Sequence, residues 1–356
     1  MKKIVLAFDS FKGSISASQA CTAAAKGILQ DSPDSEIISI PMSDGGEGMV
    51  QCFMPFLKLE KIVFRAHDPL MRPIEAVYAI APESKTAYME MASTSGLTRL
   101  AIHERNPLET TTYGVGEMIT DAIKQGCCHI VMGIGGSATC DGGKGMLEAL
   151  KQNGILAENF VKNIDITVAC DVTNPLYGTN GAAYIFAPQK GATPEQVKTL
   201  DDRLRQWAAE TEKKGFATTD DAFHPGSGAA GGLGYALLTY LHARLKSGID
   251  IVLDTLGFDK AISNCNLIIT GEGKSDAQTL MGKVPQGILK RACKAHVPVL
   301  LLSGAVEDKD KLLEAGFSEV VSINEGDNRC LEELMSHDVA CQNITRSVQR
   351  IINQMF

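Results

Sequence analysis

The sequence lacks the short motifs by which several common functional sites are recognised. Its ten cysteines include the neighbours Cys127 and Cys128 but no C-x-x-C pair, which argues against a zinc cage and a redox dithiol. Its seven histidines include no H-E-x-x-H pattern or other metal-ligand spacing. Neither the P-loop pattern G-x-x-x-x-G-K-[ST] nor the protein-kinase motifs D-F-G and H-R-D occur. These absences exclude the familiar zinc, thiol-exchange and nucleotide-binding machines.

Long apolar runs and an excess of positive charge are also missing. No apolar stretch approaches the roughly 20 residues that a bilayer-spanning helix needs. The N-terminal apolar run, Ile4–Phe8, is too short for a signal peptide and is followed at once by Asp9. We therefore expect a soluble, cytoplasmic protein without a membrane partner. The net charge of −8, from 34 basic and 42 acidic residues, has the wrong sign for a nucleic-acid partner. A homo-oligomer is compatible with the sequence, which leaves the oligomeric state open.

What is present is the rhythm of an α/β protein. Short β-branched runs alternate with Gly-rich or Asp-rich turns and amphipathic helices, the pattern of a parallel sheet covered by helices. The expected strands are Ile4–Phe8, Glu36–Pro41, Ile130–Ile134, Ile166–Cys170, Leu267–Thr270, Val299–Leu302 and Val320–Ile323. With 356 residues, two domains are favoured over one. We expect residues 1–66 and 262–356 to form one discontinuous domain and residues 67–261 to be inserted as a second.

Other elements are predicted from local signals. Ile74–Met91 reads as an antiparallel hairpin that turns at Pro82–Lys85. Capping boxes at Ser16 with Gln19 and at Thr193 with Gln196 predict helices that end near Gln30 and Lys214. The glycine-rich run Pro225–Gly234 precedes an apolar segment that predicts a helix to about Leu245.

Two clusters of glycines and polar residues follow the first two expected strands. Asp9, Ser10, Lys12 and Gly13 stand where the first strand ends and a helix begins, and Asp44–Gly48 stands in the same relation to the second. The carboxyl ends of strands form the ligand crevice of open α/β sheets, and helix N-termini attract anions. The structural alternative for the first cluster is an ordinary turn with a solvated lysine. For the second cluster it is a pair of acids that cap a helix.

A third cluster, Gly133–Gly143, suggests two different ligands. It contains G-x-G-x-x-A after a strand, which is a weak dinucleotide fingerprint, but the acid expected about 20 residues further on is absent. So many glycines still imply that backbone lies close to a ligand, most simply to phosphate oxygens.

Two further clusters lie later in the chain. In Pro225–Gly234, small residues at every position fit either tight helix packing or a phosphate cradle, with packing slightly favoured. In Gly271–Lys283, carboxylates, amines and hydroxyls gather at the end of a strand before the next helix. A run of solvated surface charges is the less favoured interpretation of this last cluster.

Seven segments together resemble the type 1 glycerate kinase family, in family order from residue 9 onward. They are Asp9–Ser14, Asp44–Gly48, Gly133–Gly143, Ala169–Leu176, Pro188–Ala192, Pro225–Gly234 and Gly271–Lys283. The resemblance implies one flavodoxin-like domain with a parallel sheet, an inserted domain with a mixed, restriction-enzyme-like sheet, and a cleft between them. It also implies ATP, Mg²⁺ and glycerate as ligands. The expected reaction is ATP-dependent phosphorylation of glycerate, with 2-phosphoglycerate favoured and 3-phosphoglycerate as the alternative product.

Phosphoryl transfer requires two anions to be held in line, charge to be offset, and a carboxylate to accept a proton. The expected catalytic residues are Lys12 and Lys283 as anion binders, and Glu272 and Asp276 as base and metal ligand, in an order that spacing leaves open. The expected substrate and phosphate contacts are Asp9, Ser10, Gly13, Asp44, Gly45, Gly46, Glu47, Gly135, Gly136, Ser137, Asp141, Asp171, Asn174, Lys190, Gly226, Gly228, Gly231, Gly232, Gln278 and Thr279. A nicotinamide-dependent hydroxy-acid dehydrogenase and a non-catalytic ligand sensor are the alternatives from other classes.

Overall fold

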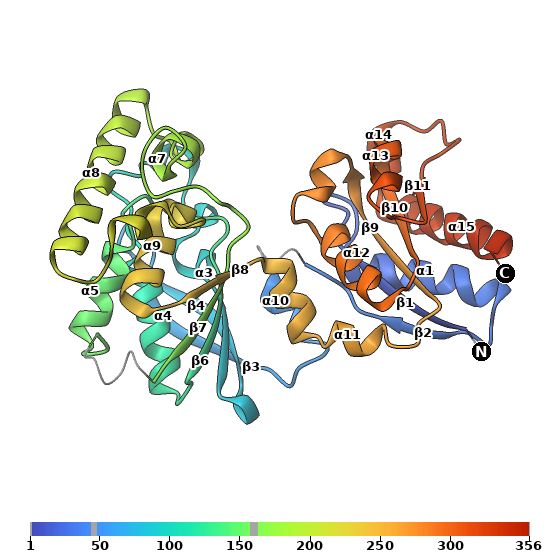
Figure 1. Cartoon of the computed structure of the whole chain (residues 1–356), viewed down its shortest axis with the longest axis horizontal. Coiled ribbons are helices and arrows are strands. Elements are labelled where there is room, and N and C mark those ends of the chain that lie inside the picture. Colours follow the sequence, from blue (N-terminus) through green and yellow to red (C-terminus); the bar gives the residue numbers. More distant parts are fainter. Residues whose placement is uncertain (1, 44–47, 157–162, 356) are drawn as a thin grey trace. The chain divides into compact units, whose positions relative to one another are not determined.

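The chain divides into two compact units in a computed structural model that describes residues 2–43, 48–156 and 163–355 (Figure 1). The terminal unit comprises Met1–Asp44 with Ile249–Phe356, and the inserted unit comprises Gly45–Gly248. These divisions differ from the expected boundaries near residues 67 and 261. The strand at Glu60–His67 explains the first difference, because it pairs along its whole length with the next strand of the inserted unit.

The terminal unit is built on one parallel sheet. Its strands are β1 (Lys3–Phe8), β2 (Glu36–Ser39), β9 (Leu267–Ser275), β10 (Val299–Val306) and β11 (Glu319–Ser322), in the order β11-β10-β9-β1-β2. Every neighbouring pair is parallel. Numbered along the chain, this is the flavodoxin-like order 2-1-3-4-5 read from its other edge, which confirms the expected fold of this unit.

Helices cover this sheet, and two of them, α1 and α12, begin where the sequence predicts a helix. They are α1 (Ala17–Asp31), α10 (Gly248–Thr255), α11 (Phe258–Ala261), α12 (Val284–Ala295), α13 (Lys309–Glu314), α14 (Leu331–Leu334) and α15 (His337–Met355). The capping box of Ser16 and Gln19 at the start of α1 is present. Helices α1 and α15 pack closely at Gly27, where a Cβ atom would lie 2.5 Å from the carbonyl oxygen of Thr345.

The inserted unit has a mixed sheet, as expected, and this sheet has six strands. They are β3 (Glu60–His67), β4 (Pro73–Ala81), β5 (Thr86–Glu90), β6 (His129–Gly133), β7 (Asp165–Ala169) and β8 (Arg244–Lys246), in sequential order across the sheet. Strands β3, β4 and β5 are antiparallel, which confirms the hairpin, whereas β5 to β8 run parallel.

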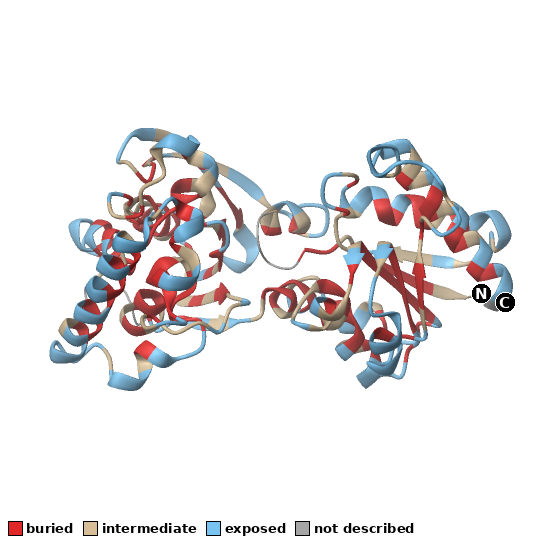
Figure 2. Ribbon diagram, turned by 90° about the horizontal axis from the view of Figure 1, so that it is seen from above, coloured by how far each residue is buried: buried red, intermediate tan, exposed pale blue. Residues whose placement is uncertain are grey.

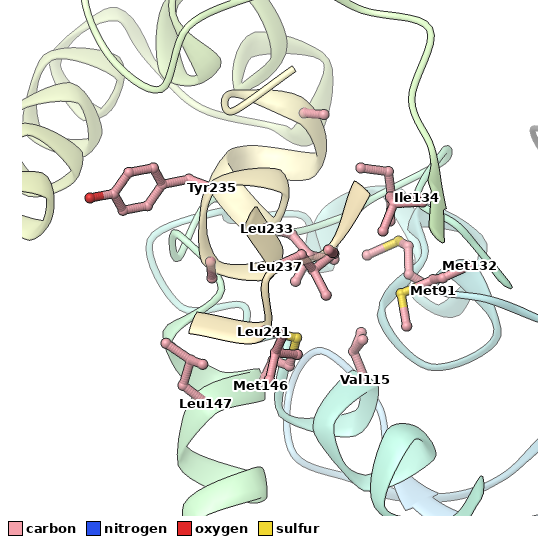
Figure 3. Close-up of a cluster of buried hydrophobic side chains, with 14 of the residues drawn as sticks. Met91, Val115, Met132, Ile134, Met146, Leu147, Leu233, Tyr235, Leu237 and Leu241 are labelled. Atoms are coloured by element: carbon pink, nitrogen blue, oxygen red, sulfur yellow. The ribbon is translucent and has the colours of Figure 1, made fainter. Parts of the chain in front are cut away.

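The helices of the inserted unit enclose its core. They include α2 (Met49–Phe53), α3 (Ala92–Ser95), α4 (Tyr113–Lys124), α5 (Lys144–Gln152), α7 (Ala182–Phe186), α8 (Pro194–Lys213) and α9 (Ala229–Leu241). Figure 3 shows Met132 of the sheet and Val115, Met146 and Leu237 of three helices within one apolar cluster. Figure 2 shows the buried residues concentrated on the strands and on the inward faces of the helices of each unit.

Two local predictions need correction, and one strand was missed. The helix expected to reach Leu245 ends at Leu241, where His242 adopts the left-handed conformation (φ 52°), and the chain then forms β8. Strand β9 continues to Ser275 instead of ending at Thr270. Strand β3 was not predicted, because it lies at the sheet edge and its side chains are largely exposed. None of the described helices is long and apolar enough to cross a membrane.

Candidate active site

Residues from three distant segments meet in a cavity of about 540 Å³ in the terminal unit. It lies at the carboxyl ends of β1, β9 and β10, at the point where the strand order reverses between β1 and β9. Ligands of open α/β sheets bind at this switch point. The residues that line this terminal-unit cavity include Asp9, Ser10, Lys12, Glu272 and Lys283, all of which were predicted as site residues.

The segment after β1 forms a tight turn at the cavity wall. Asp9 accepts a hydrogen bond from the amide of Ser10 through Oδ1 (2.7 Å), and Gly13 adopts a left-handed conformation (φ 78°) that favours glycine. The Lys12 side chain is exposed, as expected of a mobile charge. The hydroxyl of Ser14 is buried at the cavity and has no hydrogen-bond partner within the described part of the chain. The turn therefore offers both a cation and an unused hydroxyl to a ligand.

Glu272 is the most deeply buried carboxylate of this cavity, with 6% of its surface exposed. Its Oε1 accepts hydrogen bonds from Thr279 Oγ1 (2.6 Å) and Ser275 Oγ (3.0 Å). Lys283 Nζ lies 3.7 Å from its other oxygen, Oε2. The structure thus places Thr279, expected as a substrate contact, behind Glu272, where it fixes the orientation of the carboxylate.

Asp276 has a structural contact that bears on its expected role. Its Oδ1 accepts a hydrogen bond from the amide of Gln278 (2.8 Å), so that it caps the 3₁₀ helix Ala277–Leu280. Lys274 Nζ lies 3.9 Å from Asp276 and 2.9 Å from Glu307. Capping uses only part of the carboxylate, and its role in catalysis stays a prediction.

Several residues of the terminal-unit cavity were missed by sequence reasoning. Lys274, Glu307 and Asn324 line it, and the last two follow the ends of β10 and β11. The rule that drew attention to Asp9 applies equally to these strand ends. The signal was weaker there because no glycine cluster accompanies Asn324.

A smaller cavity, of about 230 Å³, lies in the inserted unit at the ends of β6 and β7. Its lining includes Gly135, Gly136, Ser137, Asp171 and Lys190, all predicted as contacts. Cys170, Phe186 and Gln189 also line it and were not predicted. We call it the inserted-unit cavity.

Lys190 is the most unusual side chain of the inserted-unit cavity, because it is 2% exposed. Its Nζ donates hydrogen bonds to Ser137 Oγ (2.6 Å) and to the carbonyl oxygen of Thr139 (2.7 Å). Burial, the largest effect, lowers the pKa of Lys190 to about 8, opposed by the nearby Cys140 and Asp141. The two hydrogen bonds fix the ammonium group against the loop that follows β6.

The glycine run Pro225–Gly234 owes its composition to close packing. A Cβ atom on Gly228 would lie 2.2 Å from the carbonyl oxygen of Pro175, and one on Gly231 would lie 2.0 Å from that of Thr139. Gly231 and Gly232 are also left-handed, at φ 68° and 89°. Packing is thus confirmed for these positions, while ligand contacts of Gly226, Gly228, Gly231 and Gly232 stay predictions.

Three other predicted contacts hold the inserted unit together. Asp141 accepts hydrogen bonds from the amides of Thr112, Gly143 and Gly145, at 2.8 to 3.1 Å, and so ties the start of α4 to the start of α5. Asp171 accepts one from the amide of Gly248 (2.9 Å). Asn174 donates one to the carbonyl oxygen of Asn180 (2.8 Å). None of these bonds excludes a ligand role for the three side chains, which stays a prediction.

The predicted contacts Asp44, Gly45, Gly46 and Glu47 lie outside the described residues. The residue that follows them, Gly48, lines a second cavity of the inserted unit, of about 590 Å³, with Glu90 and Arg99. Glu90 accepts hydrogen bonds from the amides of Gly48 (3.2 Å) and Val50 (3.0 Å) at the start of α2. Within the described ranges, no group of three or more His, Cys, Asp and Glu side chains is placed to hold a metal ion.

The fold and the cavities define an α/β protein that presents lysines, carboxylates and glycine-rich turns at the carboxyl ends of parallel strands. The chain belongs to the glycerate kinase family, because the sequence model of that family matches residues 4–159 and 155–355. It is therefore an enzyme of a kinase family.

Relatives support this assignment along nearly the whole chain. A protein of Bacillus cereus named glycerate kinase is 40% identical, over 98% of this chain and 97% of its own length. One of Escherichia coli named glycerate 2-kinase is 40% identical, over 90% and 91% respectively. A Salmonella typhimurium LT2 protein of known crystal structure, provisionally assigned as glycerate kinase 2, is 35% identical to this chain in sequence. It covers 100% of this chain and 98% of that chain, with a TM-score of 0.84.

Proposed function

We propose that this enzyme transfers the γ-phosphoryl group of ATP to a hydroxyl group of glycerate in the cytoplasm, with 2-phosphoglycerate and ADP as products. The observation that carries the proposal is the family match together with a relative named glycerate 2-kinase that is 40% identical over 90% of the chain. The same match favours a kinase over the dehydrogenase and the non-catalytic sensor.

The terminal-unit cavity supports this chemistry by its charges. A phosphoryl group in transfer spreads negative charge over its oxygens, and catalysis consists largely of positioning and of offsetting that charge. Lys12 and Lys283 supply cations at the cavity, and the hydroxyl of Ser14 supplies a donor. We assign these groups to the phosphate oxygens.

The hydroxyl that attacks must lose a proton, for which a carboxylate is needed. Glu272 lines the cavity and is held by two hydroxyl donors, so that its free oxygen faces Lys283. Asp276 follows on the same segment. We propose that one of these carboxylates accepts the proton and that the other binds the metal ion.

The donor set at the cavity fits Mg²⁺. This ion prefers oxygen ligands and is typically held by one or two carboxylates together with substrate phosphates and water, so a dedicated cluster of protein ligands is not required. Glu272 and Asp276 are the residues that would hold it, and Mg²⁺ bound there would offset charge on the phosphates. Asp9 is a further carboxylate at the cavity.

A coupled assay of ADP release with the purified protein tests the proposal. Turnover is expected only when ATP, Mg²⁺ and glycerate are all present. The ³¹P NMR spectrum of the product then assigns the position of transfer, because phosphorus couples to the single C2 proton in 2-phosphoglycerate and to the C3 methylene protons in 3-phosphoglycerate. ADP release that persists without glycerate, or equal turnover of unrelated hydroxy acids, would contradict the assignment of the substrate.

A further inference from the structure

The inserted-unit cavity contains a buried positive charge whose direct contacts, within the described part of the chain, are neutral, although Asp141 lies near enough to raise its pKa. Lys190 is 2% exposed, and its two hydrogen-bond partners are a hydroxyl and a carbonyl oxygen, both of which are neutral. No carboxylate in the described ranges makes an ion pair with Nζ at 4.0 Å or less. A buried charge is costly unless it is paired, so an uncompensated ammonium at a cavity wall calls for an anion.

The size of the cavity limits which anion can enter. Cavities that hold drug-sized ligands measure about 300–1,000 Å³. The inserted-unit cavity, at about 230 Å³, falls below that range, whereas the terminal-unit cavity, at about 540 Å³, falls within it. A three-carbon acid suits the smaller cavity, and a nucleoside triphosphate does not.

The remaining lining suits a small hydroxy acid. Gly135 and Gly136 bring backbone to the wall without side chains, and the Ser137 hydroxyl and the Gln189 amide are polar groups that can meet hydroxyls. Leu97 and Phe186 supply the apolar part of the wall. Asp171 also lines the cavity and can accept hydrogen bonds from hydroxyls, so the wall offers one cation for a carboxylate and several polar groups for hydroxyls.

We propose that the inserted-unit cavity is the glycerate site, with the glycerate carboxylate bound by Lys190, and that the nucleotide does not bind there. The inference rests on the proposed function for the identity of the ligand, but it concerns a separate question, namely which unit recognises which substrate. Lys190 is then a specificity residue, because it distinguishes an acid from a neutral polyol of the same length.

The first experiment measures equilibrium binding by calorimetry at pH 7. Wild-type protein should bind glycerate and should bind glycerol, which lacks the carboxylate, much more weakly. Lys190→Met should weaken glycerate binding by about 10- to 150-fold, the effect of losing one hydrogen bond to a charged group, and leave the affinity for a non-hydrolysable ATP analogue unchanged. Lys198→Met, which removes an exposed lysine from α8, is the matched control and should change neither affinity.

The outcomes separate this inference from the proposed function. Absence of glycerate-dependent ADP release from wild-type protein would contradict the proposed function itself. Normal wild-type turnover, combined with unchanged glycerate affinity in Lys190→Met, would overturn only the inference. So would an equal loss of affinity for the ATP analogue, which would make Lys190 a nucleotide contact. If Lys190→Met does not fold, Lys190→Gln keeps a donor for Thr139 and should show the same selective loss.

A second measurement uses the wild-type protein alone. In hydrogen-exchange mass spectrometry, glycerate should slow exchange in peptides that contain residues 134–137 and 189–190. The ATP analogue should instead slow exchange outside them, with peptides 9–15 and 272–283 the expected region. Protection of residues 134–137 by the ATP analogue, or protection by glycerate confined to the terminal unit, would overturn the inference.

Discussion

The terminal-unit cavity and the inserted-unit cavity hold their charges in opposite ways. In the terminal unit, Glu272 is surrounded by donors from Ser275, Thr279 and Lys283, so that the charges at the wall largely compensate each other. In the inserted unit, Lys190 is buried, its two hydrogen-bond partners are neutral, and the nearby Asp141 raises its pKa without forming an ion pair of 4.0 Å or less within the described ranges. A compensated set of acids and bases is suited to moving a proton, whereas an uncompensated cation is suited to recognising an anion. This difference is the basis on which we propose chemistry for the terminal unit and substrate recognition for the inserted unit.

The largest effect should follow from removing a carboxylate of the terminal unit. Glu272→Gln and Asp276→Asn should each lower kcat by about 10²- to 10⁴-fold, because loss of a general base or of a metal ligand has effects of that size. Steady-state kinetics at saturating ATP and glycerate measure the loss. Titration with Mg²⁺ then separates the roles, since activity of the ligand variant should recover in part at high Mg²⁺ concentration and that of the base variant should not.

The comparison between the units would fail if these variants turned over normally. Near-normal kcat in Glu272→Gln would mean that its hydrogen bonds and its ion pair with Lys283 serve only to stabilise the turn after β9. Circular dichroism of each variant shows first whether the fold is intact.

The next effect concerns stability and tests the packing of the glycine run in the inserted unit. Gly231→Ala should destabilise the protein by at least about 3 kcal/mol, because its Cβ atom would lie 2.0 Å from the carbonyl oxygen of Thr139 at a φ of 68°. Gly215 is the matched control. It is also left-handed, at φ 77°, but its Cβ atom would meet nothing within 4 Å, so Gly215→Ala should cost only about 1–2 kcal/mol.

Urea denaturation of the two variants measures the difference. Equal destabilisation by Gly231→Ala and Gly215→Ala would show that the run does not pack as closely as described. The run would then be available as a ligand cradle in the way the sequence left open.

The buried cation of the inserted unit should make stability depend on pH. Because the pKa of Lys190 is lowered from 10.5 to about 8, the unfolded chain binds more protons than the folded chain between pH 8 and 10.5. The free energy of unfolding should therefore rise with pH across this window, by on the order of 3 kcal/mol for this one group. Below pH 8 the lysine is charged in both states and the gain is absent.

Denaturation of wild-type protein and Lys190→Met at pH 7 and pH 10 isolates this contribution. The variant retains Cys140, whose pKa burial raises to about 11 despite the lowering effect of Lys190, so this thiol stays largely protonated at pH 10 in both folded proteins and adds little to the difference. An identical pH dependence in both proteins would mean that Lys190 titrates normally and that its burial carries no electrostatic cost.

A smaller effect is expected at the exposed cation of the terminal unit. Lys12→Ala should lower kcat/KM by about 10- to 1000-fold, the result of losing one charge-assisted contact of roughly 1.5–4 kcal/mol. Because Lys12 is exposed, the melting temperature should hardly change. If Lys12→Ala keeps the wild-type kcat/KM for both substrates, Lys12 is only a surface charge. The terminal unit would then lack the exposed anion-binding lysine that we compare with the buried Lys190.

The strands and the terminal-unit cavity could be predicted because their signals are local. Buried parallel strands read as continuous apolar runs, and the carboxyl ends of such strands form the ligand crevice, so Asp9 and Glu272 could each be predicted as site residues from their place after a strand. Strand β3 gave no such signal, since an edge strand with exposed side chains resembles a polar loop. The boundary expected near residue 67 falls at the end of this strand, which pairs within the inserted unit.

The contacts that distinguish the two cavities were beyond prediction because they join residues far apart in sequence. Lys190 and Ser137 are 53 positions apart, and nothing in the segment around Lys190 indicates that the lysine is buried. The tight approach of Gly231 to Thr139 is equally invisible, so that cradle and packing could not be separated. The cap formed by Asp276 is different, because it is a local contact between residues close in sequence, Asp276 with Gln278 and Thr279.

The smallest effect is expected on the stability of Asp276 variants, where the structural and catalytic roles of one side chain can be separated. Asp276 Oδ1 accepts the amide of Gln278, and Thr279 Oγ1 accepts the amide of Asp276, so that the two residues form a capping box. Asn is about as good a cap as Asp, so Asp276→Asn should change the free energy of unfolding by less than about 0.5 kcal/mol. Asp276→Ala, which removes the acceptor, should cost about 0.5–2 kcal/mol. Urea denaturation gives both values. If Asp276→Asn destabilises as strongly as Asp276→Ala, the negative charge itself stabilises this turn. A loss of kcat in the Asn variant could then no longer be attributed to chemistry alone.

If stability is kept while kcat falls, the carboxylate acts on the reaction and its capping role is separate. That outcome would support the terminal unit as the site of the chemistry.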